Sequence, residues 1–146
     1  MQLTNICRDI SEDLSDGRVY IPKSMLPIDD ISINDEAVVA CIKELLLLSE
    51  QYYESALHAI KKIPIRSRFS ILLALRLYQA IGTKINKNQN IYSASKINTT
   101  KFEKLLILIS CVFEFVFLHL FSIGKTKHNP KLHKSIKGLP FANEEI

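Results

Sequence analysis

The chain has 146 residues, of which 47% are hydrophobic, and its 19 Lys and Arg against 15 Asp and Glu give a net charge of +4. This length and hydrophobic content suffice for one globular domain with its own core, and no repeat or low-complexity segment is present. Four glycines, five prolines and long apolar runs of helical period, without alternating stretches, predict an all-α fold with no sheet.

The cysteines stand far apart, form no CxxC pair, and follow no secretory leader. These features favour a reducing, cytoplasmic location. The histidines share no ligand spacing with any cysteine, which disfavours a zinc site. The residues concerned are Cys7, Cys41, Cys111, His58, His119, His128 and His133.

The net charge hides an asymmetry between the two ends of the chain. Residues 1–36 hold eight acidic and three basic residues, a balance of −5, so the remainder carries +9. Much of this excess lies in a basic tail over residues 125–146, which is typical of contact with anionic lipid or nucleic acid, or of a solvated segment. Nucleic acid is disfavoured because aromatic residues are not interleaved with the lysines.

The first predicted element is a helix over residues 1–14. On a helix that advances about 100° per residue, the polar residues of this segment fall within one narrow stripe: Gln2, Asn5, Asp9 and Asp13. A neighbouring stripe is apolar and consists of Leu3, Ile10 and Leu14. Carboxylate and amide oxygens from successive turns are the hard ligands that Mg²⁺ prefers where it bridges protein and phosphate. The stripe therefore predicts a magnesium diphosphate site.

A turn is predicted over residues 15–17, in which Gly17 takes a positive φ, followed by a loop over residues 18–27. The acids near this glycine invite comparison with an EF-hand calcium loop. Counting from Glu12, however, Lys23 stands where a bidentate glutamate is required, which excludes that motif.

Two long helices are predicted next, over residues 35–62 and 66–88, with Pro64 between them. Thr99 or Thr100 is predicted to cap the last helix. The first of the two long helices has a broad apolar stripe, in which residues recur every three or four positions: Val38, Ile42, Leu45, Leu46, Tyr52, Tyr53, Ala56, Leu57 and Ile60.

The last predicted helix, residues 101–123, contains an apolar run over residues 105–124 that is long enough to cross a bilayer. Glu114 and His119 lie inside this run, and an acid at the centre of a membrane helix costs about 2.5–3.5 kcal/mol. Burial in the core, or contact of one face with the membrane surface aided by the following lysines, is therefore favoured over a membrane span.

The sequence QLTNICRDISED followed by GRVYIP, within residues 2–22, has the form N-x-x-R-D-x-x-x-D joined to G-R-x-Y-x-P. It resembles the second aspartate-rich motif of the squalene/phytoene synthase family, and residues 48–85 resemble the family's downstream helices. The resemblance covers residues 1–104. It implies the C-terminal half of an all-α helical bundle of the isoprenoid-synthase type.

The activity that this resemblance implies is the head-to-head condensation of two prenyl diphosphates, farnesyl or geranylgeranyl, through a cyclopropylcarbinyl diphosphate. Mg²⁺, or Mn²⁺ in its place, would hold the diphosphate. The choice between the two substrates is not readable from the sequence. Use of NADPH stays open, because no GxGxxG is present and only some members of the family reduce their intermediate.

Carried over residue by residue, Asp9 and Asp13 are implied as catalytic Mg²⁺ ligands, with Asn5 as a further ligand or a diphosphate contact. Gln2 lies at the edge of the same stripe and would contact the diphosphate. Tyr78 matches a family tyrosine near the cavity, although a tyrosine on an apolar helix face is also typical of the core. The alternative for the two aspartates is a solvated acidic face.

Two arginines accompany this stripe. Arg8, which completes the implied catalytic set, and Arg18 would contact the diphosphate, or pair with Glu12 or Asp16 on the surface. Tyr20 would help to close the loop over the site.

The family's first aspartate-rich motif, which faces the second across the cavity, has no counterpart in these residues. No Ser, Thr, Asp or Asn caps the first helix either. We therefore expect part of a synthase domain over residues 1–146: the motif in 2–22, helices in 35–124 and the basic tail.

Such a C-terminal half would be inactive alone and peripheral to the membrane, its N-terminal half being a separate chain or lost. The alternative is a non-catalytic remnant that binds magnesium diphosphates weakly, or that associates with a membrane or a partner through its apolar helices.

Overall fold

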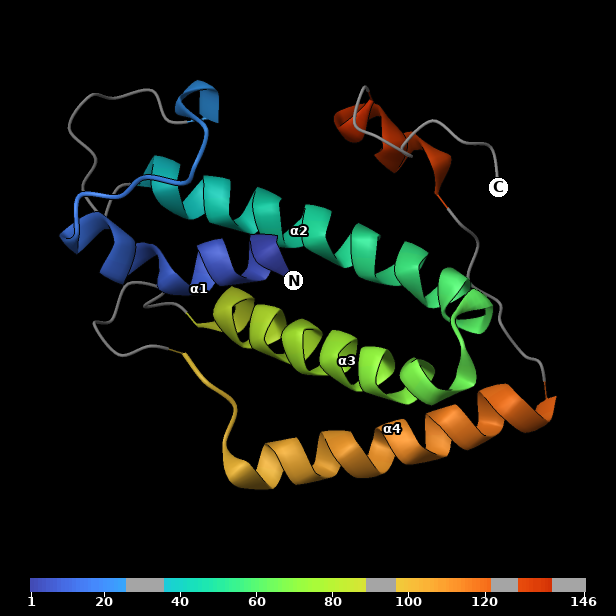
Figure 1. Ribbon diagram of the computed structural model, residues 1–146. Coiled ribbons are helices and arrows are strands. Elements are labelled where there is room, and N and C mark those ends of the chain that lie inside the picture. The colour runs from blue at the N-terminus through green and yellow to red at the C-terminus, as the bar shows by residue number, and fades with distance from the viewer. Residues whose placement is uncertain (26–35, 89–96, 122–128, 138–146) are drawn as a thin grey trace.

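The computed structural model describes residues 1–25, 36–88, 97–121 and 129–137. Within these ranges the chain forms four α-helices and three short 3₁₀ helices and contains no strand, which confirms the predicted all-α fold. Helices α2 and α3 lie side by side, α1 packs on both, and α4 packs along α3 (Figure 1). This order places α3 between α1 and α4.

Helix α1 (Gln2–Ser15) coincides with the predicted first helix to within one residue. Met1 occupies the N-cap position, and no side chain caps this end. The helix ends in the predicted turn, where Gly17 adopts a φ of 71° that glycine tolerates without strain. The backbone amide of Arg18 then donates to the carbonyl of Asp13 at 2.7 Å, which directs the chain back along the helix.

The segment after this turn returns to the core. Ile21 is buried, and a short 3₁₀ helix, η1 (Lys23–Met25), follows inside the predicted loop. The last two residues of that loop, 26 and 27, lie outside the described residues.

Helix α2 (Glu36–Ala59) continues as the 3₁₀ helix η2 (Ile60–Lys62), so that together they end where the long helix was predicted to end. Pro64 is the N-cap of α3 (Ile65–Lys87), whose ends agree with the prediction to within one residue. The guanidinium of Arg68 donates to two carbonyl oxygens at the end of η2, at distances of 2.6 to 3.2 Å. These bonds fix the corner between the two long helices.

Helix α4 (Lys101–Phe121) begins as predicted, and its predicted end at residue 123 lies outside the described residues. Thr100 and Glu103 form a reciprocal cap: the Thr100 hydroxyl accepts from the amide of Glu103 at 3.2 Å, and the Glu103 carboxylate accepts from the amide of Thr100 at 2.6 Å. Lys84 of α3 also pairs with this carboxylate at 2.7 Å.

Glu114 interrupts the apolar run of α4, but it is not left in apolar surroundings. Arg76 of α3 donates to both of its carboxylate oxygens, at 2.9 and 2.5 Å. The side chain of His119 lies outside the described residues. No helix in the described part of the chain is both long and apolar enough to cross a membrane.

The core consists of two buried clusters. The larger one joins α1, α2, the far end of α3 and the loop after α1, and the smaller one joins α2, η2 and the near end of α3. The predicted apolar stripe of α2 supplies much of both, although Tyr52 and Leu57 are half-buried and Ala56 is exposed. The buried members are Cys7, Ile10, Ile21, Val38, Cys41, Ile42, Leu45, Leu46, Ile81 and Ile85 in the larger cluster, and Tyr53, Ile60, Leu72 and Leu75 in the smaller.

Part of the basic tail docks on α2. The 3₁₀ helix η3 (Pro130–Ile136) buries Leu132, whose carbonyl accepts from the Tyr52 hydroxyl at 3.1 Å, and the amide of Asn129 donates to the Ser55 hydroxyl at 3.3 Å. This segment lies beside α2, on the side of the molecule away from α4 (Figure 1). The described lysines of the tail therefore do not flank the apolar helix as the sequence suggested.

Candidate metal-binding site

The candidate site is the polar stripe of α1. Asn5, Asp9 and Asp13 succeed one another at intervals of one turn and are each half-buried, whereas Gln2 is exposed. The inward face of the helix carries the buried residues Thr4, Cys7 and Ile10, and the other members of the expected apolar stripe, Leu3 and Leu14, pack partly buried against the same core cluster.

The side chain of Asn5 has an unsatisfied oxygen. Its Oδ1 atom is buried and has no hydrogen-bond partner among the described residues. A buried carbonyl oxygen without a partner costs about 1–3 kcal/mol, so native proteins keep few of them. An amide oxygen is also a ligand that Mg²⁺ accepts, and the position of Asn5 on the stripe fits that use.

Asp9 is held by its sequence neighbour. The Nε and Nη2 atoms of Arg8 donate to the two carboxylate oxygens of Asp9 at 2.8 and 2.9 Å, a bidentate ion pair with both side chains about one fifth exposed. The hydrogen bond to Asp9 raises the pKa of Arg8, although partial burial opposes this effect. Arg8 thus pairs with an acid inside the motif, and the charge of Glu12 also raises the pKa of Arg8.

Asp13 is held by the loop that follows the helix. The guanidinium of Arg18 donates to Asp13 at 3.3 Å and to Asp16 at 2.7 Å, so the pair with Asp16 foreseen from the sequence is present. Because Arg18 is half exposed, these bonds contribute little to stability, and solvent can exchange with them.

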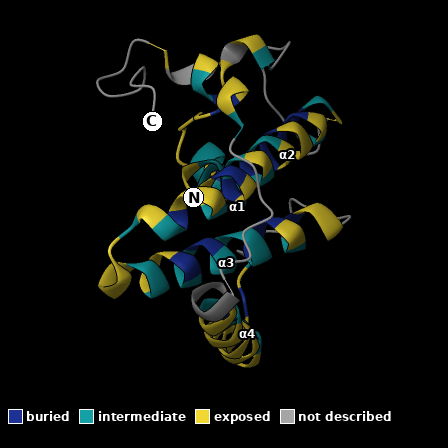
Figure 2. Cartoon of the chain, turned by 90° about the vertical axis from the view of Figure 1, so that its right-hand side faces the viewer, coloured by how far each residue is buried: buried dark blue, intermediate teal, exposed yellow. Residues whose placement is uncertain are grey.

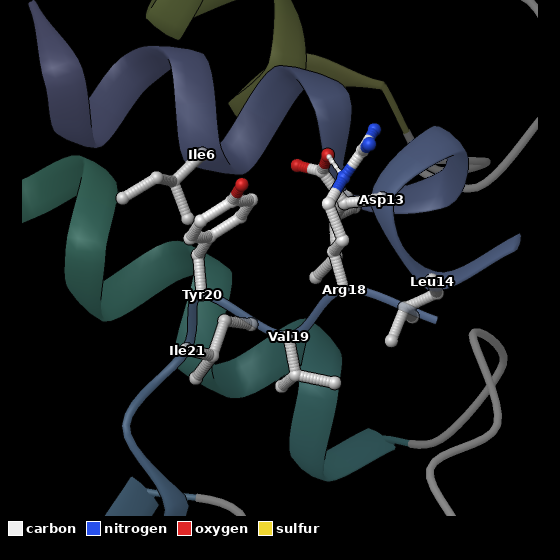
Figure 3. A pocket seen from close by; sticks show the side chains of 8 residues that line it. Ile6, Asp13, Leu14, Arg18, Val19, Tyr20 and Ile21 are labelled. Carbon is white, nitrogen blue, oxygen red and sulfur yellow. Dashed lines mark hydrogen bonds and ion pairs between the residues drawn. The ribbon is translucent and has the colours of Figure 1, made fainter. Parts of the chain in front are cut away.

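A small pocket lies beside this pair. Asp13 and Arg18 line it together with Tyr20 and apolar residues of α1 and the loop (Figure 3). Its volume of about 10 Å³ is room for a single water molecule, not for a diphosphate. Tyr20, expected to close the loop over the site, is exposed in this structure. Any diphosphate bound by the stripe must therefore sit outside this pocket, on the open side of α1.

Tyr78 lies on α3, half-buried against the smaller core cluster, so its position combines the two roles that the sequence left open. Its charge adds to the raised pKa of Arg8, after the hydrogen bond to Asp9 and the charge of Asp9. Helix α3, which carries Tyr78, packs on α1.

A buried hydrogen bond that the sequence did not reveal fixes α1 on α2. The hydroxyls of Thr4 and Tyr53 lie 2.6 Å apart, and both side chains are buried. Burial raises the pKa of Tyr53, while the bond to Thr4 lowers it. The available signal was Thr4 itself, since a threonine on the inward face of a helix requires a hydrogen-bond partner.

A second polar group links the three long helices. Arg76 binds Glu114 of α4 and donates to Gln79 at 2.7 Å, and Gln79 donates in turn to Glu50 of α2. All four side chains are half-buried. No local sequence pattern indicates this group, because its members come from three separate helices.

The residues present fit a divalent cation through their chemistry but do not complete its coordination. Their donors are two carboxylates and one orphaned amide oxygen, all hard ligands. Within the described ranges, no three His, Cys, Asp or Glu side chains gather closely enough to hold a metal. Further ligands must come from the diphosphate, from water or from another polypeptide segment.

Comparison with known proteins identifies relatives of this motif. A family model described as "Squalene/phytoene synthase" matches residues 1–103. The "15-cis-phytoene synthase" of Pantoea ananas is 33% identical over 116 residues, which cover 75% of this chain and 38% of the relative. The protein of the same name from Paracoccus sp. (strain N81106 / MBIC 01143) is 36% identical over 111 residues, which cover 73% of this chain and 36% of the relative.

A plant protein, "Phytoene synthase 2, chloroplastic" of Solanum lycopersicum, is 29% identical over 116 residues, covering 73% of this chain and 37% of its own. The chain therefore spans little more than a third of the length of the curated relatives it matches. No solved structure matches it.

Proposed function

Because the chain belongs to the squalene/phytoene synthase family, we propose that it supplies the second aspartate-rich motif of an enzyme that condenses two prenyl diphosphates head to head. The substrate would be farnesyl or geranylgeranyl diphosphate, and the first product a cyclopropylcarbinyl diphosphate. The names of the relatives favour the geranylgeranyl branch, since they are phytoene synthases.

Asn5, Asp9 and Asp13 are the residues that would hold Mg²⁺, with Mn²⁺ as the alternative ion. The metal would supply charge that stabilises the leaving diphosphate. The chain's own contribution is to orient these oxygens along one stripe. The other proposed diphosphate contacts are Gln2, Arg8, Arg18 and Tyr20, and Arg8 and Tyr78 complete the proposed catalytic set with the two aspartates.

The observation that carries this proposal is the buried Oδ1 atom of Asn5, which has no hydrogen-bond partner among the described residues. Both aspartates have arginine partners, whereas Asn5 alone among the described residues retains a buried side-chain acceptor without a hydrogen-bond partner, and it lies one turn before Asp9. A ligand that carries positive charge would satisfy it. The sequence around it is the part of the chain that the family model matches.

We propose further that the chain is inactive by itself. One carboxylate pair cannot hold the several metal ions that ionisation of a prenyl diphosphate needs, and both carboxylates are engaged by arginines. A complementary N-terminal half, from a separate chain, would supply the facing motif. The free, buried thiols Cys7, Cys41 and Cys111 suit a reducing compartment, so we place this activity in the cytoplasm.

The test is reconstitution. The full chain is mixed with an N-terminal half taken from a phytoene synthase, and pyrophosphate release from geranylgeranyl diphosphate is measured with and without Mg²⁺. We expect release only when both halves and Mg²⁺ are present. Release by this chain alone would contradict the proposed division of the site, and no release from a pair that demonstrably associates would favour the non-catalytic remnant.

A further inference from the structure

Thr4 lies where helices α1, α2 and α3 meet, and Figure 2 shows buried residues on each of these helices. Its side chain is completely buried, and its hydroxyl lies 2.6 Å from the hydroxyl of Tyr53 on α2. Its methyl group lies over α3, since a β-carbon placed on Gly82 would be 3.7 Å away from it. A single side chain therefore holds α1 against both of the helices on which it packs.

A second contact, one turn further along α1, fixes the same face. Cys7 is buried, and its thiol donates to the backbone carbonyl of Ile42 on α2 at 3.9 Å. This bond is weak, as hydrogen bonds from thiols are. The bond between Thr4 and Tyr53 is the stronger of the two, so a roll of α1 about its own axis has to break it first.

The rotation of α1 sets the direction in which the metal stripe points. At about 100° per residue, Asn5, Asp9 and Asp13 lie about 100°, 140° and 180° around the helix from Thr4. A roll of about 20° would shift the Cα atoms of the helix by about 0.8 Å and the side-chain oxygens by more. Mg²⁺ tolerates little displacement of its ligands, because it demands near-ideal octahedral geometry.

Asn5 is the residue of the stripe whose present orientation is least favourable. Its buried Oδ1 atom has no hydrogen-bond partner within the described part of the chain, whereas Asp9 and Asp13 are bound by arginines. A roll of α1 that carried this oxygen into solvent would satisfy it, and the helix does not take that rotation. Some contact must oppose the roll, and the buried bond of the adjacent residue, Thr4, does so.

We propose that Thr4 is a positioning residue of the candidate metal site, which holds α1 at the rotation where the Asn5 oxygen stays unsatisfied until a divalent cation binds. This role rests on the proposed function, because Thr4 can position metal ligands only if Asn5 and Asp9 bind a metal. Tyr53 is the other half of the device, since it provides the partner hydroxyl. A site held in this way binds a cation without first reorienting its ligands.

The test compares two properties of the full chain, its affinity for Mn²⁺ alone, by electron paramagnetic resonance, and its Tm. Thr4→Val keeps the shape of the side chain but removes its hydroxyl, and Tyr53→Phe removes the partner hydroxyl. Each should lower Tm, because one hydroxyl stays buried without a partner, and each should weaken Mn²⁺ binding about tenfold, as loss of a group that orients a metal ligand does. Thr4→Ser keeps the hydroxyl and should bind Mn²⁺ within about twofold of the wild type.

The double variant, Thr4→Val with Tyr53→Phe, separates positioning from stability. With both hydroxyls removed, neither is left unpaired, so Tm should recover towards the wild-type value. Mn²⁺ binding should stay about tenfold weaker than in the wild type, because the bond that sets the rotation is still absent. Leu72→Ala is the matched control: Leu72 lies in the smaller core cluster, so this variant should lower Tm and leave the Mn²⁺ affinity of the folded chain unchanged.

The outcomes distinguish the positioning role from the metal site itself. A wild-type chain that binds no Mn²⁺, or binds it equally well with Asp9→Asn, would overturn the proposed site and the role of Thr4 with it. Binding that depends on Asp9 but is unchanged by Thr4→Val and Tyr53→Phe would overturn the positioning role alone. Recovery of both Tm and Mn²⁺ affinity in the double variant would also overturn it, because the single variants would then act only through stability.

Discussion

Helices α1 and α4 each leave one face without cover from the described protein, but the two faces have opposite chemistry. The stripe of α1 carries carboxylates and an unsatisfied amide oxygen, with the arginines that neutralise it on the same surface. The outer face of α4 is apolar, with Phe102 and Phe113 exposed, and the acids of that helix point the other way, into bonds with α3.

The two faces also differ in which helix carries the basic partners of their acids. In the proposed site, Arg8 and Arg18 would leave Asp9 and Asp13 for an incoming diphosphate, because all four side chains share one partly exposed surface. On α4, Arg76 and Lys84 belong to the neighbouring helix and hold its acids inward. The first arrangement suits exchange of ligands, and the second suits permanent attachment of a helix whose outer side stays apolar.

The largest expected effect concerns the α1 stripe. In the reconstituted enzyme, Asp9→Asn should lower pyrophosphate release at least about a hundredfold, because loss of a metal ligand removes several kcal/mol of transition-state stabilisation. Asp16→Asn, which removes a surface acid bound to the same loop arginine as Asp13, should change the rate less than about twofold. Equal losses in steady-state release would mean that the stripe is only a solvated acidic face.

The free energy of unfolding should depend on the buried core of the bundle and not on the exposed face of α4. Leu72 is completely buried between α3 and α2, and Leu72→Ala should lower the free energy of unfolding by about 2–5 kcal/mol, through lost burial and the cavity left behind. Phe113→Ser, on the exposed outer face of α4, should change it by less than about 0.5 kcal/mol. Urea unfolding measures both, and a large loss with Phe113→Ser would show that another surface already covers this face of α4.

If Arg8 exchanges Asp9 for a bound anion, Arg8→Gln should have opposite effects on Mn²⁺ affinity in the absence and in the presence of pyrophosphate. Arg8→Gln removes the guanidinium from the carboxylate of Asp9, so Mn²⁺ alone should bind about three- to tenfold more tightly, by electron paramagnetic resonance. With inorganic pyrophosphate present, the same variant should bind Mn²⁺ more weakly, because the anion loses its guanidinium. Arg66→Gln, an exposed arginine on α3, is the control. Changes of the same sign in both conditions would mean that Arg8 only screens charge.

The helices were predictable because local rules set their ends. Gly17 permits the turn after α1, Pro64 begins α3, and the reciprocal cap of Thr100 and Glu103 begins α4. The polar stripe of α1 could be predicted because its residues recur about once per helical turn. Each of these inferences needed only residues that are close together in the sequence.

The contacts that support the site were not predictable in this way. Thr4 and Tyr53 are 49 residues apart, and Arg76 and Glu114 are 38 apart, so their meeting depends on which helices pack together. Tertiary packing decided these cases, and no local pattern encodes it.

The bond between Thr4 and Tyr53 should therefore matter more than a surface pair. Tyr53→Phe leaves the Thr4 hydroxyl buried without its partner, which should cost about 1–3 kcal/mol of unfolding free energy. Tyr52→Phe is a matched control on the same helix, because its hydroxyl is only partly buried and binds the docked tail. Urea unfolding compares the two. If Tyr53→Phe costs no more than Tyr52→Phe, the bond does not fix α1.

The smallest effect should come from the cap that begins α4, and it should depend on pH. The bonds from Lys84 and then from Thr100 lower the pKa of Glu103 to about 2, from an ordinary value of 4.5. Since the folded state holds the charged form of Glu103 more firmly than the unfolded state does, the carboxylate stabilises the fold above about pH 4.5, and this contribution is lost as the pH falls towards 2.

Glu103→Gln keeps an acceptor for the cap but removes the charge. Its Tm should therefore lie slightly below that of the wild type at pH 7, and the difference should shrink steadily between pH 4.5 and 3. Added salt should reduce the difference at pH 7 as well, because the ion pair with Lys84 is exposed. Glu54→Gln, an exposed glutamate of α2, should show neither trend. A difference that stays constant from pH 7 to 3 would mean that the cap acts only through its hydrogen bonds, and that the attachment of α4 to α3 does not depend on charge at this end.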